Sequence, residues 1–472
     1  MLLTLADLVS ATGGELVQGS PNAVVSSFSS DSRSVGRGDA FFALHGPRFN
    51  GEHFIAAALE LGAAGAIASR WAGGLTGLYP HAFFLRVPDA GRAMGDVAHL
   101  IRRRHGGRVA LVAGSAGKTT VKEMLAHALT HMRMRALATQ KNFNNLIGLP
   151  LTLFQLDRRH EAVVLEAGMN EPGELARLTQ IADPDVALLT NVGAAHIGKF
   201  GSHEALVQAK ADMWRHCGGE TVFVVNADCP VSRRILRELG RSNPTTTFSI
   251  TKEADVSVEG IERAHPYGYH FSIVCEGRRL PAFLAMPGLF NVANAAAMAA
   301  CVRAMGLGLD EAVDSLISFQ PRDMRSVVRV AGGVTFLIDC YNCSPDAMRG
   351  AIEGLVEMDC AGRRVAVLGD MLELGEAEEY YHEQIGRMSE LEQIDALFTL
   401  GVRARSILRA ARENEGFSGA SAAFNKTEDL LHQLLDYLQP GDTVLFKASR
   451  LMRFEDLVEP LAAYFERQAQ IA

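Results

Sequence analysis

Residues 109–120 have the residue types and the spacing of a phosphate-binding loop. The apolar run VALVA predicts a buried strand, residues 114–117 form a glycine-containing loop, and the stretch that begins at Lys118 has apolar residues at helical spacing. Backbone N–H groups in such a loop, together with the positive end of the following helix, can hold an anion. We therefore expect Lys118 to contact terminal phosphates and the Thr119 hydroxyl to ligate Mg²⁺.

This loop is a short variant of the general phosphate-loop pattern. That pattern has a glycine six residues before the lysine, where this chain has Val112. An ordinary strand–helix turn with a surface lysine is the alternative, but the Lys-Thr pair falls at the predicted helix start, directly after the strand. The nucleotide contacts expected from the loop are Gly114, Ser115, Ala116, Gly117, Lys118, Thr119 and Thr120.

Polar residues also follow the neighbouring strands of the same predicted sheet. Apolar, strand-like runs alternate there with helical stretches, which is typical of a parallel sheet with helices on both faces. Ligands gather at the carboxyl ends of such strands, where Glu166, Asn191 and His196 fall. A carboxylate such as Glu166 suits Mg²⁺. His196 is a weaker candidate, because imidazole prefers softer ions and a loop histidine is often an ordinary surface residue.

Two further stretches have both a functional and an ordinary interpretation. Asn142, Asn144 and Asn145 lie in an asparagine-rich loop that can bond amides or sugar hydroxyls, although a plain polar turn has the same composition. Lys210 lies in the helical stretch HEALVQAKADMW, where a single lysine is normally a solvated side chain.

Near the N-terminus, Ser32 and Arg33 follow a predicted strand and have glycines close behind them. The forked donors of Arg33 can hold a phosphate, and the polar loop at residues 46–53 can close over the same ligand. An ordinary turn is an equally good interpretation of this segment.

Composition disfavours several functional classes. The chain has 472 residues and a formal net charge of −8, and its one basic cluster, Arg102–Arg104, is short, so nucleic-acid binding is not favoured. No apolar run approaches the roughly eighteen residues of a membrane span, and the start, MLLTLADLVSATGG, does not have a signal-peptide pattern. The seven scattered cysteines indicate reduced thiols in a cytoplasmic protein, and we interpret the CxxC spacing of Cys340 and Cys343 as structural.

The order of these patterns predicts an α/β protein of three domains. Residues 1–105 indicate a small α/β domain, and residues 106–320 a parallel-sheet domain with an antiparallel meander between about 252 and 287. Residues 321–472 form another α/β series. Polar residues or glycine follow its predicted strands at Asp339, Asp370, Gly401 and Lys447.

Taken together, several stretches resemble the Mur ligases of bacterial cell-wall synthesis, over nearly the whole chain. These stretches are DSRSVGRGDAFFALHG, GSAGKTT, NFNNLIGLP, LEAGMNEPGEL, TNVGAAHIGKFGS with AKADMW, NVANA, DCYNCSPDAM, LGDMLELG and KASR. The resemblance implies an N-terminal UDP-binding domain, a central ATPase domain and a C-terminal Rossmann-like domain. The three predicted domains fit this order.

Within the family, the chain is most similar to the member that adds D-alanyl-D-alanine to UDP-N-acetylmuramoyl-tripeptide. This resemblance implies an ATP- and Mg²⁺-dependent amide ligase of peptidoglycan precursor synthesis, with an acyl-phosphate intermediate. It also implies a cytoplasmic monomer whose partners are these two substrates.

The resemblance assigns roles to individual residues. It places UDP contacts at Ser32 and Arg33, and muramoyl-substrate contacts at Asn142, Asn144 and Asn145. It makes Thr119, Glu166, His196 and a carbamoylated Lys210 the Mg²⁺ ligands. It implies catalytic roles for Lys118, Lys210, His196 and Asn145. It assigns adenine contacts to Asn291 and Asn294, and further nucleotide contacts to Arg325, Asp339, Tyr341 and Asn342.

The chain departs from the family pattern near the nucleotide contacts. Phe290 replaces a usual histidine, Ile338 replaces the first of two acids, and Ala448 replaces a glycine. Gly198 and Lys199 stand where an acid and a glycine are usual.

Four other functions are alternatives to this assignment. One is the Mur ligase that adds the third amino acid, although its Asp-Asn-Pro-Arg-type motif is absent from this sequence. Folylpolyglutamate synthetase is a second, but a UDP-type N-terminal domain is not expected of it. The others are a phosphate-loop NTPase that acts as a switch without ligation, and a binder of cell-wall precursors that catalyses nothing.

Overall fold

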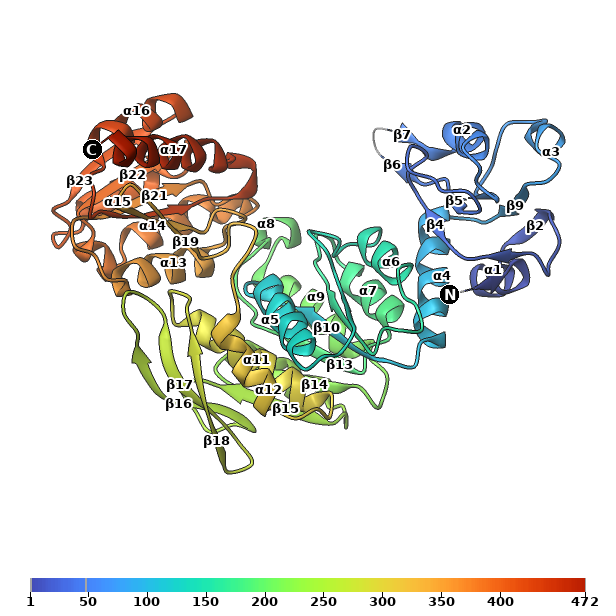
Figure 1. The fold of residues 1–472 in the computed structure, drawn as a ribbon, viewed down its shortest axis with the longest axis horizontal. Coiled ribbons are helices and arrows are strands. Elements are labelled where there is room, and N and C mark those ends of the chain that lie inside the picture. Colours follow the sequence, from blue (N-terminus) through green and yellow to red (C-terminus); the bar gives the residue numbers. More distant parts are fainter. Residues whose placement is uncertain (1, 47–48, 472) are drawn as a thin grey trace.

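Three main sheets, of five, nine and six strands, form the framework of the chain. The computed structural model describes residues 2–46 and 49–471. The sheets follow one another along the sequence, and the central one lies between the other two (Figure 1). We call the three parts the N-terminal, central and C-terminal bodies. The α/β class predicted from the sequence is therefore confirmed.

The N-terminal body is a small mixed sheet with short helices. Its first helix, α1 (Leu5–Thr12), begins with a capping box formed by Thr4 and Asp7, and it ends at Gly13 in the left-handed conformation. In spatial order the strands are β2 (Glu15–Gln18), β9 (Phe83–Arg86), β8 (Gly65–Ala68), β5 (Ala40–Phe42) and β4 (Phe28–Ser29). The smaller elements are β1 (Leu3–Thr4), β3 (Val24–Val25), β6 (His45–Gly46), β7 (Phe49–Asn50), α2 (Ile55–Glu60) and α3 (Leu75–Leu78). The predicted loop at 46–53 includes residues 47 and 48, which lie outside the described residues.

The central body contains the predicted parallel sheet and the predicted meander, joined into one sheet. Its parallel strands are β11 (Ala136–Ala138), β12 (Ala162–Glu166), β10 (Arg108–Ala113), β13 (Val186–Leu189), β14 (Val222–Asn226) and β15 (Thr245–Ser249). The meander strands are β16 (Val256–Arg263), β17 (Tyr269–Cys275) and β18 (Arg278–Leu284). The prediction did not include β11 or β15, and β15 connects the two parts.

Helices cover both faces of the central sheet, as the strand–helix alternation predicts. Alternate residues of β10 point to opposite faces, so Leu111 lies in one buried cluster and Val112 in the other. On the Val112 side lie α5 (Lys118–His131), α11 (Phe290–Ala304) and α12 (Asp310–Asp314). On the Leu111 side lie α6 (Gly148–Leu153), α7 (Glu174–Ala182), α9 (His203–Arg215) and α10 (Pro230–Leu239).

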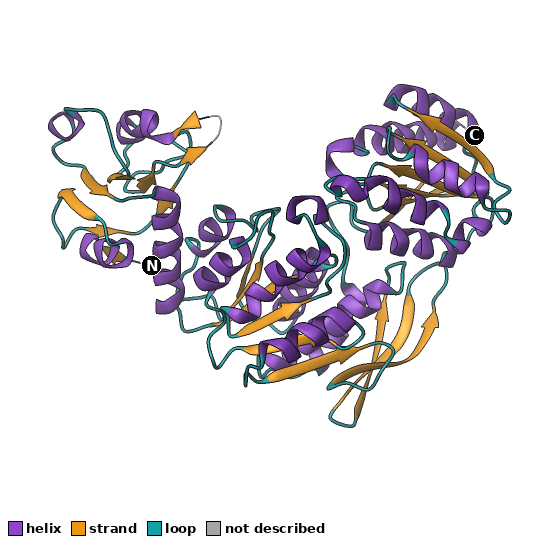
Figure 2. Cartoon of the chain, turned by 180° about the vertical axis from the view of Figure 1, so that it is seen from behind, coloured by secondary structure: helices purple, strands orange, loops and turns teal. Residues whose placement is uncertain are grey.

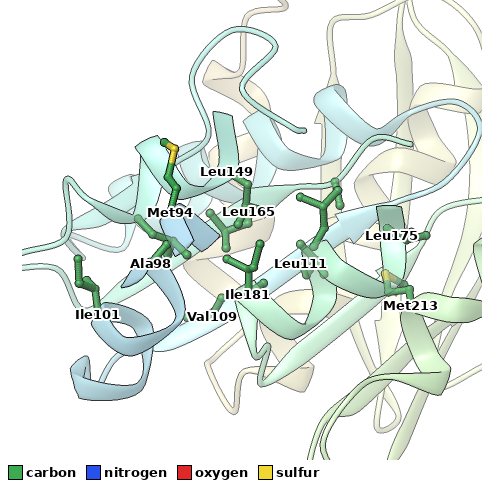
Figure 3. Close-up of a cluster of buried hydrophobic side chains, with 14 of the residues drawn as sticks. Met94, Ala98, Ile101, Val109, Leu111, Leu149, Leu165, Leu175, Ile181 and Met213 are labelled. Atoms are coloured by element: carbon green, nitrogen blue, oxygen red, sulfur yellow. The ribbon is translucent and has the colours of Figure 1, made fainter. Parts of the chain in front are cut away.

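Helix α4 (Ala90–Arg104) joins the N-terminal body to the central body. It packs against α1 on one side and against α6 and α7 on the other. Its residues Met94 and Ile101 belong to the same buried cluster as Leu165 of the central sheet (Figure 3). The two bodies therefore share a hydrophobic core. The domain boundary predicted at residue 105 falls at the end of this helix and stays a prediction.

The C-terminal body is a mostly parallel sheet between two layers of helices (Figure 2). Its strands are β19 (Val327–Ala331), β20 (Val334–Ile338), β24 (Thr443–Lys447), β21 (Arg364–Gly369), β22 (Ala396–Leu400) and β23 (Ala420–Phe424). Its helices are α13 (Pro345–Glu357), α14 (Glu378–Gly386), α15 (Arg405–Glu413), α16 (Thr427–Tyr437) and α17 (Glu455–Ile471). The predicted boundary at residue 320 lies in the segment before β19. The edge strands β19 and β23 were absent from the prediction.

The seven cysteines are all unpaired thiols. Burial raises the pKa values of both Cys340 and Cys343 to about 12, which suits packed, unreactive side chains. Among the described residues, no helix is both long and apolar enough to cross a membrane.

A buried arginine fixes α4 on the central body. Arg102 donates to the backbone oxygens of Ala182 and Asp183, both at 3.1 Å, and to the Asp185 carboxylate at 2.8 Å. Its side chain is 9% exposed. The neighbouring Arg103 pairs with Asp183 at 3.0 Å, but its side chain is 66% exposed.

We expect Arg102→Ala to lower the free energy of unfolding by ~3 kcal/mol, because it removes a buried guanidinium from two backbone oxygens and from the Asp185 carboxylate, which keeps only the Val109 N–H as a donor. Denaturant unfolding measures this loss. The matched control is Arg103→Ala, which removes an exposed ion pair and should cost ~0.5 kcal/mol. Equal losses in the two variants would contradict the structural role of Arg102.

Candidate active site

A cavity of about 510 Å³ lies between the central and C-terminal bodies. The phosphate loop, the asparagine-rich loop and the ends of the central strands form one side, and residues of the C-terminal body form the other. The predicted residues that line it are Ser115, Ala116, Gly117, Lys118, Thr119, Thr120, Asn142, Asn144, Asn145, Glu166, His196, Asn294, Arg325, Asp339, Tyr341 and Asn342. The chain thus brings most of its predicted site residues to one place.

The loop after β13 holds the phosphate loop in shape. The Asn191 side chain accepts from Ala116 N at 2.9 Å and donates to Ala116 O at 3.2 Å. Ser115 Oγ donates to Gly193 O at 3.1 Å and accepts from Gly193 N at 2.8 Å. Gly114 has a φ of +143°, and a Cβ there would lie 2.0 Å from Thr190 Oγ1, so this position requires glycine.

Lys118 lies at the start of α5, directly after the loop. Its ammonium donates to the backbone oxygens of Gly114 at 2.8 Å and Ser115 at 3.1 Å. Burial lowers the pKa of Lys118, while the nearby Glu166 carboxylate opposes this shift. The lysine is therefore held at the loop, where a phosphate would replace the carbonyl oxygens as its partner.

Glu166 ends β12 and is 2% exposed. Its carboxylate accepts hydrogen bonds from Thr119 Oγ1 and Asn144 Nδ2, both at 2.8 Å. These three side chains come from a strand, a helix start and a loop that are distant in sequence. Buried carboxylates need such donors, because an unpaired buried charge is costly.

Thr119 and Glu166 fit a hard cation such as Mg²⁺, because both offer oxygen atoms beside the phosphate loop. In the described part of the chain, no group of three or more His, Cys, Asp or Glu side chains is arranged to hold a metal ion. Phosphate oxygens and water would have to complete the coordination, as is usual for Mg²⁺ at nucleotide sites.

Lys210 lies on α9, outside the cavity wall. The interpretation of this lysine as a solvated side chain is wrong, because the residue is 2% exposed. Burial, together with repulsion from Lys118, lowers the pKa of Lys210 to about 7. The structure therefore places a second lysine close to the phosphate loop.

His196 contacts the C-terminal body. Its Nδ1 atom lies 2.5 Å from Glu373 Oε2, and Lys199 Nζ lies 2.7 Å from Glu373 Oε1. The contact with His196 and the neighbouring Lys199 ammonium lower the pKa of Glu373 to about 2. Glu373 belongs to the stretch LGDMLELG, but no local pattern singles it out, because its partners lie in another body.

The C-terminal wall of the cavity is built from paired groups. Lys447, at the end of β24, donates to Asp339 at 2.7 Å and to Asn342 O at 2.9 Å. The Arg325 guanidinium lies 4.1 Å from the centre of the Tyr341 ring. Such stacking leaves the edge of the guanidinium available to a ligand.

Five predicted residues do not line this cavity. Gly114 is the first residue of the phosphate loop, and Lys210 lies on α9. The Asn291 amide is fully buried and donates to Pro287 O at 2.8 Å, and it accepts from Asn294 at 3.1 Å. Ser32 and Arg33 lie in the N-terminal body, where Arg33 pairs with Asp31 at 2.7 Å.

Comparisons with known proteins agree with this geometry. A model of the Mur ligase middle domain matches residues 112–302, and a model of the Mur ligase, glutamate ligase domain matches residues 324–450. The chain is 32% identical, over 93% of each sequence, to the UDP-N-acetylmuramoyl-tripeptide–D-alanyl-D-alanine ligase of Bacillus subtilis.

Two solved structures are similar to the whole chain. A crystal structure of MurF from Acinetobacter baumannii has a TM-score of 0.88 at 30% identity, covering 98% of this chain and 99% of that one. The MurF ligase from Thermotoga maritima in complex with ADP has a TM-score of 0.82 at 29% identity, covering 94% and 98%.

We expect Asn191→Ala to weaken binding of a non-hydrolysable ATP analogue by about 10-fold, because two hydrogen bonds that shape the phosphate loop are lost. Equilibrium titration measures the affinity. Gln208→Ala removes an exposed amide on α9 that bonds Glu204 and Arg215, and it should leave the affinity unchanged. A folded Asn191→Ala variant with normal affinity would refute this role.

Proposed function

The chain belongs to the Mur ligase family, and from this premise we propose that it is an ATP-dependent amide ligase that joins D-alanyl-D-alanine to UDP-N-acetylmuramoyl-tripeptide in peptidoglycan synthesis. One observation carries the proposal. In a chain similar over 93% of its length to such a ligase, the phosphate loop and the C-terminal body meet at a single cavity.

The reaction requires activation of a carboxylate. The terminal carboxylate of the tripeptide attacks the γ-phosphate of ATP and gives an acyl phosphate and ADP, and the dipeptide amine then displaces phosphate. Both steps build negative charge on oxygen atoms. Lys118 lies where it can offset that charge, and the phosphate-loop N–H groups hold the polyphosphate in place.

Thr119 and Glu166, with His196 as a further candidate ligand, would hold Mg²⁺, which would supply further charge compensation on the phosphate oxygens. Thr119 and Asn144 in turn orient the Glu166 carboxylate. Asn142, Asn144 and Asn145 face the cavity, where their amides can position the muramoyl peptide.

The resemblance to the family supports further substrate contacts. We assign the UDP end of the substrate to Ser32 and Arg33 in the N-terminal body. We assign the nucleotide to Asn294, Arg325, Asp339, Tyr341 and Asn342, with Asn291 behind them as a positioning residue. Phe290 lines the cavity at the position of the usual histidine, so it can offer the base an apolar surface. A cytoplasmic location and a monomeric state remain predictions.

The assay that tests the proposed function measures phosphate release from ATP. Release should require both UDP-N-acetylmuramoyl-tripeptide and D-alanyl-D-alanine, and mass spectrometry should find the pentapeptide product. Release that is independent of the dipeptide would instead favour an NTPase switch or a ligase for a different amine.

In the same assay, we expect Lys118→Ala to lose about 100-fold or more in rate, because a preorganised positive charge is removed from the transferring phosphate. Lys426, which directly precedes α16, is exposed and does not line the cavity, so Lys426→Ala is the control and should keep the normal rate. Near-normal turnover by Lys118→Ala would refute the assignment of the phosphate loop.

We also propose that Lys210 is carbamoylated. Its buried amine lies near Lys118, and conversion to a carbamate would replace two repelling cations by an opposite pair. Carbon-13 NMR of enzyme equilibrated with labelled bicarbonate should show a carbamate signal that is missing from Lys210→Ala. An identical spectrum of the two proteins would rule the modification out.

A further inference from the structure

One acidic side chain of the cavity wall has no partner. The four acids that line the cavity are Glu166, Asp339, Asp346 and Glu373. Three of them accept hydrogen bonds or form ion pairs, with Thr119 and Asn144, with Lys447, and with His196 and Lys199 respectively. Asp346 is exposed, and it has no hydrogen bond or ion pair with any other residue of the ranges 2–46 and 49–471.

Asp346 reaches from the C-terminal body to the phosphate loop. It lies in the first turn of α13, and its carboxylate rests on Gly193 of the central body: a Cβ at Gly193 would lie 1.7 Å from Asp346 Oδ2. Gly193 in turn exchanges hydrogen bonds with Ser115 of the phosphate loop. A carboxylate from one body is therefore separated from the phosphate loop of the other by a single residue.

An unpaired carboxylate in this wall favours a cationic ligand once phosphate groups are bound in the cavity. Bound phosphate groups would repel it, so binding of the substrates favours a positive group between the two. The dipeptide brings such a group, because its amine is an ammonium at neutral pH and must approach the activated carboxyl group. A metal ion is less favoured, since Asp346 forms no group of three potential metal ligands among the described residues.

We infer that Asp346 binds the ammonium group of the incoming D-alanyl-D-alanine and holds its nitrogen beside the acyl phosphate. This inference rests on the proposed function. In the transfer step the nitrogen forms a bond to the acyl carbon, and the bond from that carbon to the phosphate oxygen breaks. The nitrogen loses two protons, one of which leaves on the phosphate and the other in solvent.

The test compares the two half-reactions in Asp346→Asn, which keeps the shape of the side chain but removes its charge. We expect the KM for D-alanyl-D-alanine to rise by about 10- to 100-fold, as for loss of a charge-assisted hydrogen bond. Tripeptide-dependent exchange of label between ADP and ATP, measured without dipeptide, should stay normal, because that step needs no ammonium. Asp346→Glu should restore part of the dipeptide affinity.

A matched control separates this role from helix stability, because an acid in the first turn of a helix also interacts with the helix dipole. Asp429 is an exposed acid in the first turn of α16, outside the cavity, so Asp429→Asn should leave the KM for the dipeptide unchanged.

An analogue of the dipeptide without the ammonium group tests whether Asp346 recognises that positive charge. D-lactyl-D-alanine has a hydroxyl in place of the amine, and its inhibition constant should be the same for wild type and Asp346→Asn. Equal loss of affinity for amine and hydroxyl compounds would overturn the inference. An unchanged KM for the dipeptide, with a higher Mg²⁺ requirement, would overturn it in favour of a metal ligand. A wild-type enzyme that forms no amide would overturn the proposed function itself.

Discussion

The two hydrogen bonds to Glu166 are the contacts on which the rest of the site depends. Thr119 belongs to the helix after the phosphate loop and Asn144 to the asparagine-rich loop, so one buried carboxylate fixes both segments relative to β12. A buried charge is stable only while its donors remain in place. The geometry of the phosphate loop and that of the asparagine-rich loop are therefore not independent.

The C-terminal body forms the other wall of the site, mainly with polar and charged side chains that already have partners within the protein. Lys447 neutralises Asp339, the Arg325 guanidinium stacks on Tyr341, and Glu373 meets His196 across the boundary. Because these charged side chains are paired with one another, few of them are left unpaired in the cavity wall. The acid that this body leaves unpaired is a candidate contact for a charged group of a substrate.

Local patterns explain what could be predicted from the sequence. The strand, loop and helix around Lys118 and the acid at the end of β12 follow from apolar periodicity and from the rule that ligands bind at the carboxyl ends of parallel strands. Short edge strands such as β23 were missed, because its sequence ASAAF has weak strand propensity. Glu373 and Asp346 were missed because their contacts are with the central body, and such contacts cannot be predicted from the spacing of residues within one segment. The burial of Lys210 likewise depends on how α9 packs.

The N-terminal body is not joined to the central body by a flexible linker. The two share a continuous hydrophobic core around α4, so a rotation of α4 would move the N-terminal body with it. Because α4 has 15 residues, it is about 22 Å long, and a tilt of about 10° at its buried end would move the other end by about 4 Å. Such a rotation breaks no strand pairing in either sheet. The distance between the N-terminal body and the cavity can thus be changed by side-chain repacking around a single helix.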